Sequence, residues 1–217
     1  MTLLWKLTDD QGYTGCSIGK PVLWTPGCTH QGRGRTKRMC TSAVIHAYRS
    51  PLQAGFMDPE HGEYIERGTF RLLLCEGEVV AEDGTKVGCK KLKALSWEDS
   101  TLVTLSPAAR VRTAIKFGLM CCAQADWVAW AEKWLSGKDR SEKTARIWTN
   151  WDQREDAGVR LAAAAGAAAW NMEEHPLNSA KLTAWAGYQT AEQVGEPFLD
   201  LAEMFEGLIA QSIAEES

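Results

Sequence analysis

The sequence is short of acidic residues over one long stretch. Residues 11 to 57 contain six Lys or Arg and no Asp or Glu, although the whole chain has a formal net charge of −4. Long apolar runs are also missing, since none reaches the roughly 18 residues that a membrane span needs. Residues 1 to 10 lack the basic segment, apolar stretch and cleavage site of a signal peptide. We therefore expect a cytoplasmic protein without membrane segments that meets an anionic ligand near its acid-free stretch.

Several motifs of metal and cofactor chemistry are absent as well. The chain has seven cysteines but no Cys-x-x-Cys pair, and structural zinc sites usually contain such close pairs. We expect reduced, buried thiols rather than a metal site. The phosphate-cradling glycine motifs and a recognisable nucleophile elbow are missing too, so the sequence predicts no cofactor and no catalytic residue. The residues weighed as zinc ligands are Cys16, Cys28, His30, Cys40 and His46.

Residues 1 to 100 have the pattern of a β-rich domain. Ser50 and Pro51 predict the start of a helix over residues 52–57, because serine caps free amides and proline is tolerated at the first helical position. We expect this helix to end before Pro59. Asp83-Gly84 predicts a turn between two strands. The predicted strands cover residues 2–8, 44–48, 69–75, 78–81, 86–89 and 92–97.

Residues 101 to 217 change to a helical period. Ser106-Pro107 predicts the start of a helix, because apolar positions three and four apart follow it. Trp127, Trp130 and Trp134 lie on one face of a second helix over residues 126–135. Alanine-rich sequence predicts a long helix over residues 141–170, followed by helices over 177–191 and 197–213. The fold class is therefore α+β. Helices with apolar stripes on more than one side also predict an even-numbered homo-oligomer.

The candidate site lies in the β-rich half, whose net charge is +1 against −5 beyond residue 100. Arg33, Arg35 and Arg38 could clamp phosphate, because the guanidinium fork suits two oxygens at once; the alternative is a solvated loop. His46 and Tyr48 share one strand face and could contact a base or ribose, or could be satisfied beneath the sheet. Nucleic acid is disfavoured, since the basic cluster is short and the chain acidic.

Residues 45–54, from Ile45 to Ala54, have the pattern of a strand-to-helix junction, and residues 76–87, from Glu76 to Val87, have that of a hairpin. Both segments resemble an accessory protein family of bacteriophages. Residues 127–141 and the alanine-rich tail resemble its helical half. The resemblance implies an N-terminal β-rich domain and a helical C-terminal domain without an established activity. The basic segment from Arg33 to Arg38 departs from the family pattern.

Three functions remain open from the sequence. The first is a phage protein that sequesters an anionic, nucleotide-like small molecule, such as an immune signal of the host. The second is an enzyme on a nucleotide or NAD-like molecule, with His46 and Tyr48 holding a ribose and Glu76 or Glu78 polarising it. The third is an adaptor that binds proteins through its helices. Asp58, Glu60 and Glu63 are expected to form an exposed acidic turn.

Overall fold

A computed structural model of the chain describes residues 1–15, 20–62, 64, 65, 68, 70–151, 156–173, 175–194 and 198–215. The fold class is α+β, as predicted. The chain forms two compact units, residues 1–104 with 198–202 and residues 105–197 with 203–217. No helix within the described ranges is long and apolar enough to cross a membrane.

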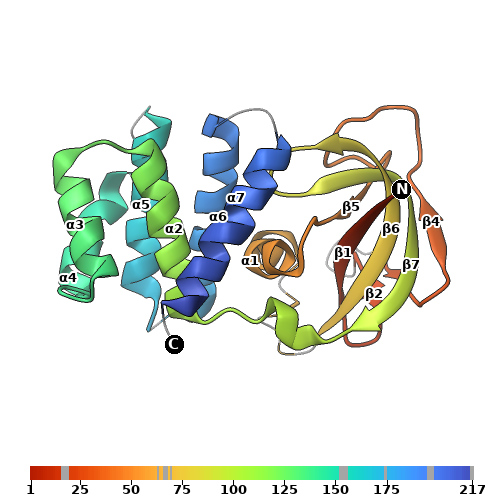
Figure 1. Ribbon diagram of the computed structural model, residues 1–217, viewed down its shortest axis with the longest axis horizontal. Helices are drawn as coiled ribbons and strands as arrows, with labels where there is room; N and C mark the ends of the chain where they lie inside the picture. The colour runs from red at the N-terminus through yellow and green to blue at the C-terminus, as the bar shows by residue number, and fades with distance from the viewer. Residues whose placement is uncertain are drawn as a thin grey trace. The chain divides into compact units, whose positions relative to one another are not determined.

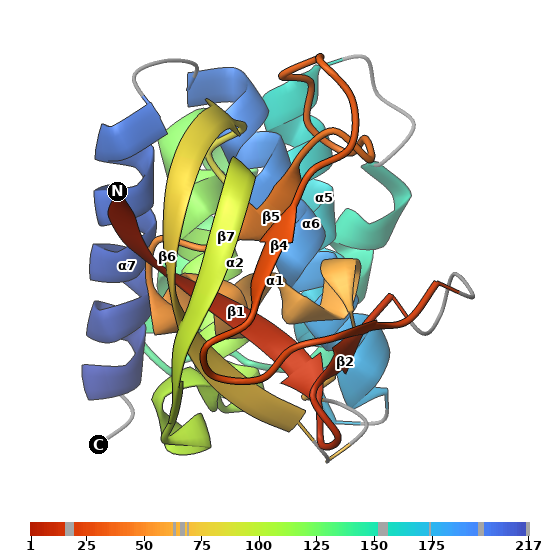
Figure 2. The same ribbon diagram turned by 90° about the vertical axis from the view of Figure 1, so that its right-hand side faces the viewer.

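The first unit contains a five-stranded antiparallel sheet (Figures 1 and 2). Strand β1 (Thr2–Asp9) pairs with β6 (Phe70–Glu82), and β6 pairs with β7 (Val87–Glu98). Both β4 (Thr29–Gln31) and β5 (Ile45–Ala47) pair with β7, at different points along its length. Two short strands, β2 (Tyr13–Thr14) and β3 (Val22–Leu23), form a separate ribbon. The buried centre of this unit contains Leu4, Trp24, Ala47, Leu73, Cys75, Val87, Cys89, Leu92 and Ala94.

Strands β6 and β7 are each longer than the sequence predicts. The expected break at Glu76-Gly77 is wrong, because β6 passes through Gly77 with local shifts of register on either side. Gly77 is needed for close packing rather than for a turn, since a Cβ there would stand 2.8 Å from the Cys89 sulfur. The predicted turn at Asp83-Gly84 is confirmed, with Gly84 at a positive φ of 77°. One long hairpin therefore replaces four short strands.

Helix α1 (Pro51–His61) begins as predicted but ends later. The Ser50 hydroxyl accepts a hydrogen bond from the Gln53 amide at 3.1 Å, and Pro51 opens the helix. Pro59 does not stop it, and the helix continues to His61 although proline donates no backbone hydrogen bond. The last turn closes through the Gly62 amide, which donates to the Asp58 carbonyl at 2.8 Å. Asp58 is consequently helical and 1% exposed, so the expected exposed acidic turn is wrong at this residue, while Glu63 and the Glu60 side chain lie outside the described residues.

The second unit is helical. It contains α2 (Pro107–Cys121), α3 (Ala125–Leu135), α4 (Glu142–Ala145), α5 (Ala157–Asn171), α6 (Pro176–Val194) and most of α7 (Phe198–Ala214), with the 3-10 segment η3 (Arg146–Trp151) between α4 and α5; another 3-10 turn, η2 (Ser100–Val103), belongs to the first unit. The predicted single helix over 141–170 is wrong. Trp148 in η3 is buried against Trp127 and Trp130. A new helix, α5, then begins after Asp156, whose carboxylate caps it by accepting a hydrogen bond from the Val159 amide at 3.0 Å. Tertiary packing outweighs the helix propensity of this stretch.

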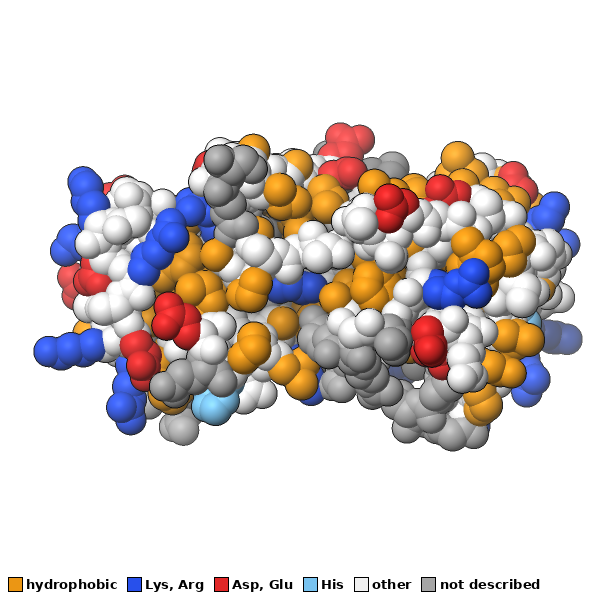
Figure 3. All heavy atoms as spheres, turned by 90° about the horizontal axis from the view of Figure 1, so that it is seen from below, with side chains coloured by type: hydrophobic (Ala, Val, Ile, Leu, Met, Phe, Trp, Pro, Cys, Tyr) orange, Lys and Arg blue, Asp and Glu red, His pale blue; other side chains and the backbone are white. Residues whose placement is uncertain are grey.

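Helix α5 packs closely on its neighbours through its small residues. A Cβ at Gly158 would stand 2.2 Å from the Cys121 carbonyl oxygen, and one at Gly166 would stand 2.4 Å from the Trp148 Cβ. Ala162, Ala165 and Ala168 are fully buried. The alanine-rich stretch is therefore core of this unit, not a surface left for another copy. On the face shown in Figure 3, hydrophobic side chains lie in small groups separated by polar and charged ones.

Candidate functional site

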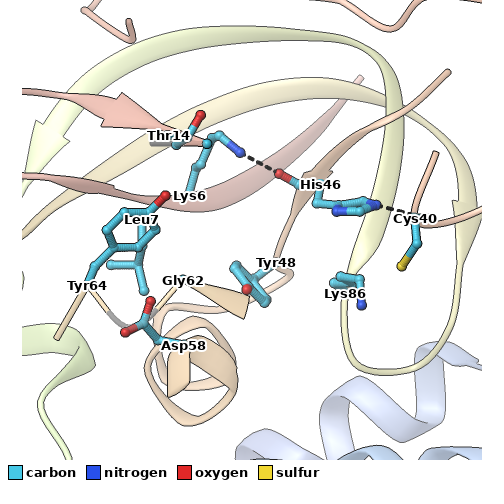
Figure 4. Close-up of a pocket in the computed structure, with 11 residues that line it drawn as sticks. Lys6, Leu7, Thr14, Cys40, His46, Tyr48, Asp58, Gly62, Tyr64 and Lys86 are labelled. Carbon is cyan, nitrogen blue, oxygen red and sulfur yellow. Dashed lines mark hydrogen bonds between the residues drawn. The ribbon is translucent and has the colours of Figure 1, made fainter. Parts of the chain in front are cut away.

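The described residues of the first unit enclose a cavity of about 220 Å³. Its wall comes from β1, β2, β5, the end of α1 and the residue before β7 (Figure 4). The side chains that carry chemistry are two lysines, an imidazole, two phenols, one carboxylate, one hydroxyl and one thiol. These are Lys6, Lys86, His46, Tyr48, Tyr64, Asp58, Thr14 and Cys40.

Strand pairing places Tyr48 and Lys6 next to each other. Tyr48 and Trp5 exchange two backbone hydrogen bonds of 2.8 Å, which fix the chain after β5 against β1. Lys6, the next residue of β1, donates from Nζ to the His46 carbonyl oxygen at 2.8 Å (Figure 4). Backbone pairing thus brings Lys6 of β1 to the same wall of the cavity as His46 and Tyr48, about 40 residues later in the sequence.

Lys86 is positioned by the turn of the long hairpin. The Asp83 carboxylate accepts from the Thr85 amide at 3.1 Å, the Thr85 hydroxyl at 2.7 Å and the Lys86 amide at 3.0 Å. The same carboxylate forms an ion pair with Lys86 Nζ at 3.3 Å. Burial alone would raise the pKa of Asp83, but the Lys86 charge and these hydrogen bonds lower it below its ordinary value. Lys86 is 4% exposed, so the turn holds a buried ammonium group at the cavity.

Side-chain hydrogen bonds fix the Asp83-Gly84 turn to helix α1. Gln53 donates from its side-chain amide to the Gly84 carbonyl at 3.1 Å and accepts from the Arg49 amide at 3.0 Å. Arg49 forms two hydrogen bonds with Glu82, one from Nε at 2.7 Å and one from Nη2 at 2.5 Å. Arg49, one of the cations of the acid-free stretch, is therefore neutralised inside the fold rather than offered to a ligand.

His46 is a neutral hydrogen-bond donor at the cavity. Its Nε2 accepts from the Cys40 amide at 3.1 Å, which leaves Nδ1 as the protonated ring nitrogen. Burial, followed by the charges of Lys86 and Lys6, lowers the pKa of His46 to about 4. Both lysines therefore act on the same imidazole, and the cavity is electropositive. A ring whose second nitrogen is already occupied is a poor general base.

Burial also changes the pKa values of the neighbouring groups. It lowers the pKa of Lys6 to about 8, against an ordinary value of 10.5, so the amine remains mainly protonated at pH 7. It raises the pKa of Tyr48 well above 10, with a further rise from the Asp58 charge, so the phenol stays protonated. Tyr48 is 7% exposed. The cavity thus presents donors at neutral pH, apart from the carboxylate of Asp58.

Asp58 and Tyr64 form the wall at the end of α1. Asp58 Oδ2 accepts from the Ile65 amide at 2.8 Å, which fixes the chain that follows the helix. The Tyr64 ring lies over Gly62, where a Cβ would stand 2.3 Å from a ring carbon. Glycine at this position therefore allows the phenol to close one side of the cavity.

The predicted site residues divide into two groups. His46 and Tyr48 both line the cavity, as their spacing along a strand suggests. Arg33, Arg35 and Arg38 lie on an exposed loop and are not among the residues that line it. The loop nevertheless ends at the cavity, because Cys40 lines it and the Thr41 hydroxyl donates to the Arg38 carbonyl at 2.8 Å.

The sequence did not indicate Lys6, Lys86 or Asp58 as site residues. The sheet brings Lys6 and Lys86 together although they are far apart in the chain, and no local pattern reports such a contact. The one available signal was the Asp-Gly turn, which places the following lysine at the end of a hairpin. Glu76 and Glu78, the carboxylates expected in an enzyme, do not line the cavity.

The candidate metal ligands have other contacts. His30 Nε2 lies 2.9 Å from the Leu23 carbonyl oxygen, and its ring packs on Trp24 at a centroid distance of 4.4 Å. Cys16 lies outside the described residues. Burial raises the pKa of the Cys75 and Cys89 thiols to about 12 and about 11, so both are protonated at neutral pH. No group of three metal-binding side chains is gathered within the described ranges.

Comparison with known proteins gives no relative. No protein-family model, no curated protein and no solved structure matches this chain. The resemblance to phage accessory proteins therefore stays a prediction, and the chemistry of the cavity is the basis for a function.

Proposed function

We propose that the protein binds a small anionic, nucleotide-like molecule, with an anionic group of that ligand in the cavity of the first unit. The observation that carries the proposal is the convergence of Lys6 and Lys86 on one cavity, each close enough to lower the pKa of His46. Two buried ammonium groups and a neutral imidazole donor suit the oxygens of a phosphate group. Sequestration takes place in the cytoplasm, the host cytoplasm if a phage encodes the chain.

The size of the cavity limits how much of the ligand it takes. Pockets that enclose a drug-sized molecule measure about 300–1,000 Å³, and this one measures about 220 Å³. A phosphate or a sugar fits, and the remainder of a nucleotide extends outward. The exposed loop that ends at Cys40 supplies Arg33, Arg35 and Arg38 for that part. Tyr48 and Tyr64 add aromatic surface at the cavity wall.

Binding without turnover agrees with the groups at the cavity. His46 Nε2 is occupied by the Cys40 amide, and the Tyr48 phenol is protonated. Neither group is prepared to remove a proton from a substrate. Sequestration needs affinity and copy number rather than chemistry, which is the role we assign to a phage counter-defence protein.

Cys40 provides a direct test, because it is the exposed thiol among the described cysteines and it lines the cavity. We would measure the alkylation rate of Cys40 by mass spectrometry, with and without each member of a nucleotide panel. A bound ligand should protect Cys40 while the labelling of Cys121, in the other unit, stays unchanged. Heat denaturation of the complex should return the compound intact. A changed compound would establish the enzyme alternative.

Variants then locate the site. Lys86→Met should weaken binding by about tenfold or more, because it removes a charged hydrogen-bond donor. Lys91→Met is the matched control, since Lys91 is an exposed lysine of β7, the strand that follows Lys86, and does not line the cavity. Equal affinity of the two variants would refute the proposed site. Arg35→Ala tests separately whether the loop contributes.

A further inference from the structure

A second cationic pocket lies in the helical unit. It measures about 490 Å³ and is lined by Arg112 and Lys116 of α2, by Arg140, by the end of α3 and by Glu215. Three cations thus face one carboxylate, a local excess of two positive charges. The half of the chain that carries this pocket has a net charge of −5, so the cluster runs against the charge of its surroundings.

The carboxylate of Glu215 already occupies the position of an anion. Arg112 Nη1 and Lys116 Nζ each donate to one of its oxygens at 3.0 Å. Burial would raise the pKa of Glu215, but the hydrogen bond and charge of Lys116 and the charge of Arg112 hold it below its ordinary value. Glu215 is ionised at neutral pH and keeps a side-chain exposure of 36%, so a soluble anion can compete for its place.

Capping of α3 accounts for only part of this cluster. Arg112 Nη1 and Arg140 Nε donate at 3.1 Å to the carbonyls of Leu135 and Trp134, in the last turn of that helix. Cations are commonly found at such helix ends. Among the described residues, Lys116 donates a hydrogen bond to Glu215 and none to a residue of α3. Arg112, which is 5% exposed, lines the pocket, and its Nε is buried without a hydrogen-bond partner among the described residues.

We propose that Arg112, Lys116 and Arg140 form a second anion site, which binds the phosphate group of a small soluble molecule in competition with Glu215. A phosphate monoester carries a charge of about −1.5 to −2 at pH 7, more than the single negative charge of the carboxylate that it replaces among the three cations. Its three terminal oxygens can also accept more hydrogen bonds than the two oxygens of a carboxylate. The site is independent of the cavity in the first unit.

Inorganic phosphate is the probe, and the arginine Nε–H signals of the full-length protein in ¹H–¹⁵N spectra are the readout. Phosphate should shift the Arg112 and Arg140 signals, assigned through Arg112→Lys and Arg140→Lys. Lys116→Met should weaken this binding by about tenfold. Glu215→Gln should tighten it by about threefold to tenfold, because the competing charge is removed. Lys143→Met, an exposed lysine of α4 outside the pocket, should leave it unchanged.

Each result bears on the proposal. Unmoved arginine signals up to about 20 mM phosphate, a concentration that even millimolar affinity would saturate, would overturn it. So would a Glu215→Gln protein that binds no more tightly than the parent, since Glu215 would then be only structural. Lys86→Met, which removes the cavity of the first unit as an anion site, should not alter these signals. The two proposals therefore fail separately.

Discussion

Replacing Lys6 by Met should make the stability of the protein less dependent on pH. The Lys6 amine is buried, although the residue as a whole keeps partial exposure, and burial lowers its pKa from 10.5 to about 8. Between these two values the unfolded chain binds a proton that the folded chain does not. The free energy of unfolding of the parent therefore rises with pH across this window. At pH 7 both states are mainly protonated, and the buried charge is unfavourable.

The magnitude follows from the pKa shift. One pKa unit corresponds to about 1.4 kcal/mol, so the buried charge destabilises the folded state by about 3 kcal/mol at pH 7. By pH 10 most of this penalty is gone, a change of about 2–3 kcal/mol. The difference in unfolding free energy between the parent and Lys6→Met should change by that amount from pH 7 to pH 10. Lys6→Met should also bind the anionic ligand more weakly, because the lysine that destabilises the fold is also a proposed contact of the ligand.

The assay is urea unfolding at several pH values between 7 and 10, with separate transitions fitted if the two units unfold independently. Comparison with the variant cancels the titrating groups that do not interact with Lys6, including Tyr48. Lys91→Met is the control, since Lys91 is exposed on β7 and its curve should remain parallel to the parent. A parent–variant difference that stays constant within about 0.5 kcal/mol, well below the calculated change, would show that the Lys6 amine is hydrated and would refute this reasoning.

Three further predictions concern packing, backbone and assembly. Gly166→Ala should destabilise the helical unit by about 1–3 kcal/mol, because its Cβ would stand 2.4 Å from the Trp148 Cβ. Gly207→Ala should instead stabilise this unit by up to about 1 kcal/mol, because its Cβ would have no neighbouring atom within 4 Å. Chemical denaturation of the two variants and the parent measures both changes. Cys40→Gly should stabilise the fold by about 1 kcal/mol, since Cys40 adopts a φ of 57°; an unchanged or lower unfolding free energy contradicts this. The predicted even-numbered oligomer requires light scattering to return an even multiple of 24.0 kDa, and a monomer at micromolar concentration excludes it.

Local signals in the sequence predicted much of the fold. Ser50 with Pro51 and Ser106 with Pro107 marked two helix starts, and both serines accept a hydrogen bond from an amide three residues later. Asp83-Gly84 marked the hairpin turn. Prediction failed where tertiary packing decides the structure. Gly77 lies within β6 because a side chain there would collide with Cys89, not because the chain turns. The helix expected over 141–170 is interrupted where Trp148 is buried in the core.

The site was less accessible to such reasoning. The strand period placed His46 and Tyr48 on one face, and both line the cavity of the first unit. Charge composition favoured that half of the chain, although a second cationic pocket lies in the acidic half. Composition also gave weight to Arg49, which the fold neutralises with Glu82. Lys6 and Lys86 carry no local mark of their role, because their meeting depends on the order of strands in the sheet. The burial of a residue and its contacts with distant parts of the chain cannot be predicted from the residues next to it in the sequence.

The position of β1 in the sheet also affects how the chain is made. Trp5 pairs with Leu74, which is 69 residues further along the chain. At synthesis rates of about 5–20 residues per second, β1 leaves the ribosome roughly 3–14 s before its partner β6. During that interval the segment Leu3-Leu4-Trp5-Lys6-Leu7 is an unpaired apolar strand, and such strands readily join those of other nascent chains. Lys6 places a charge in the middle of it, as residues that oppose aggregation do. The amine that destabilises the finished sheet is thus of the kind that opposes aggregation of the strand before the sheet exists.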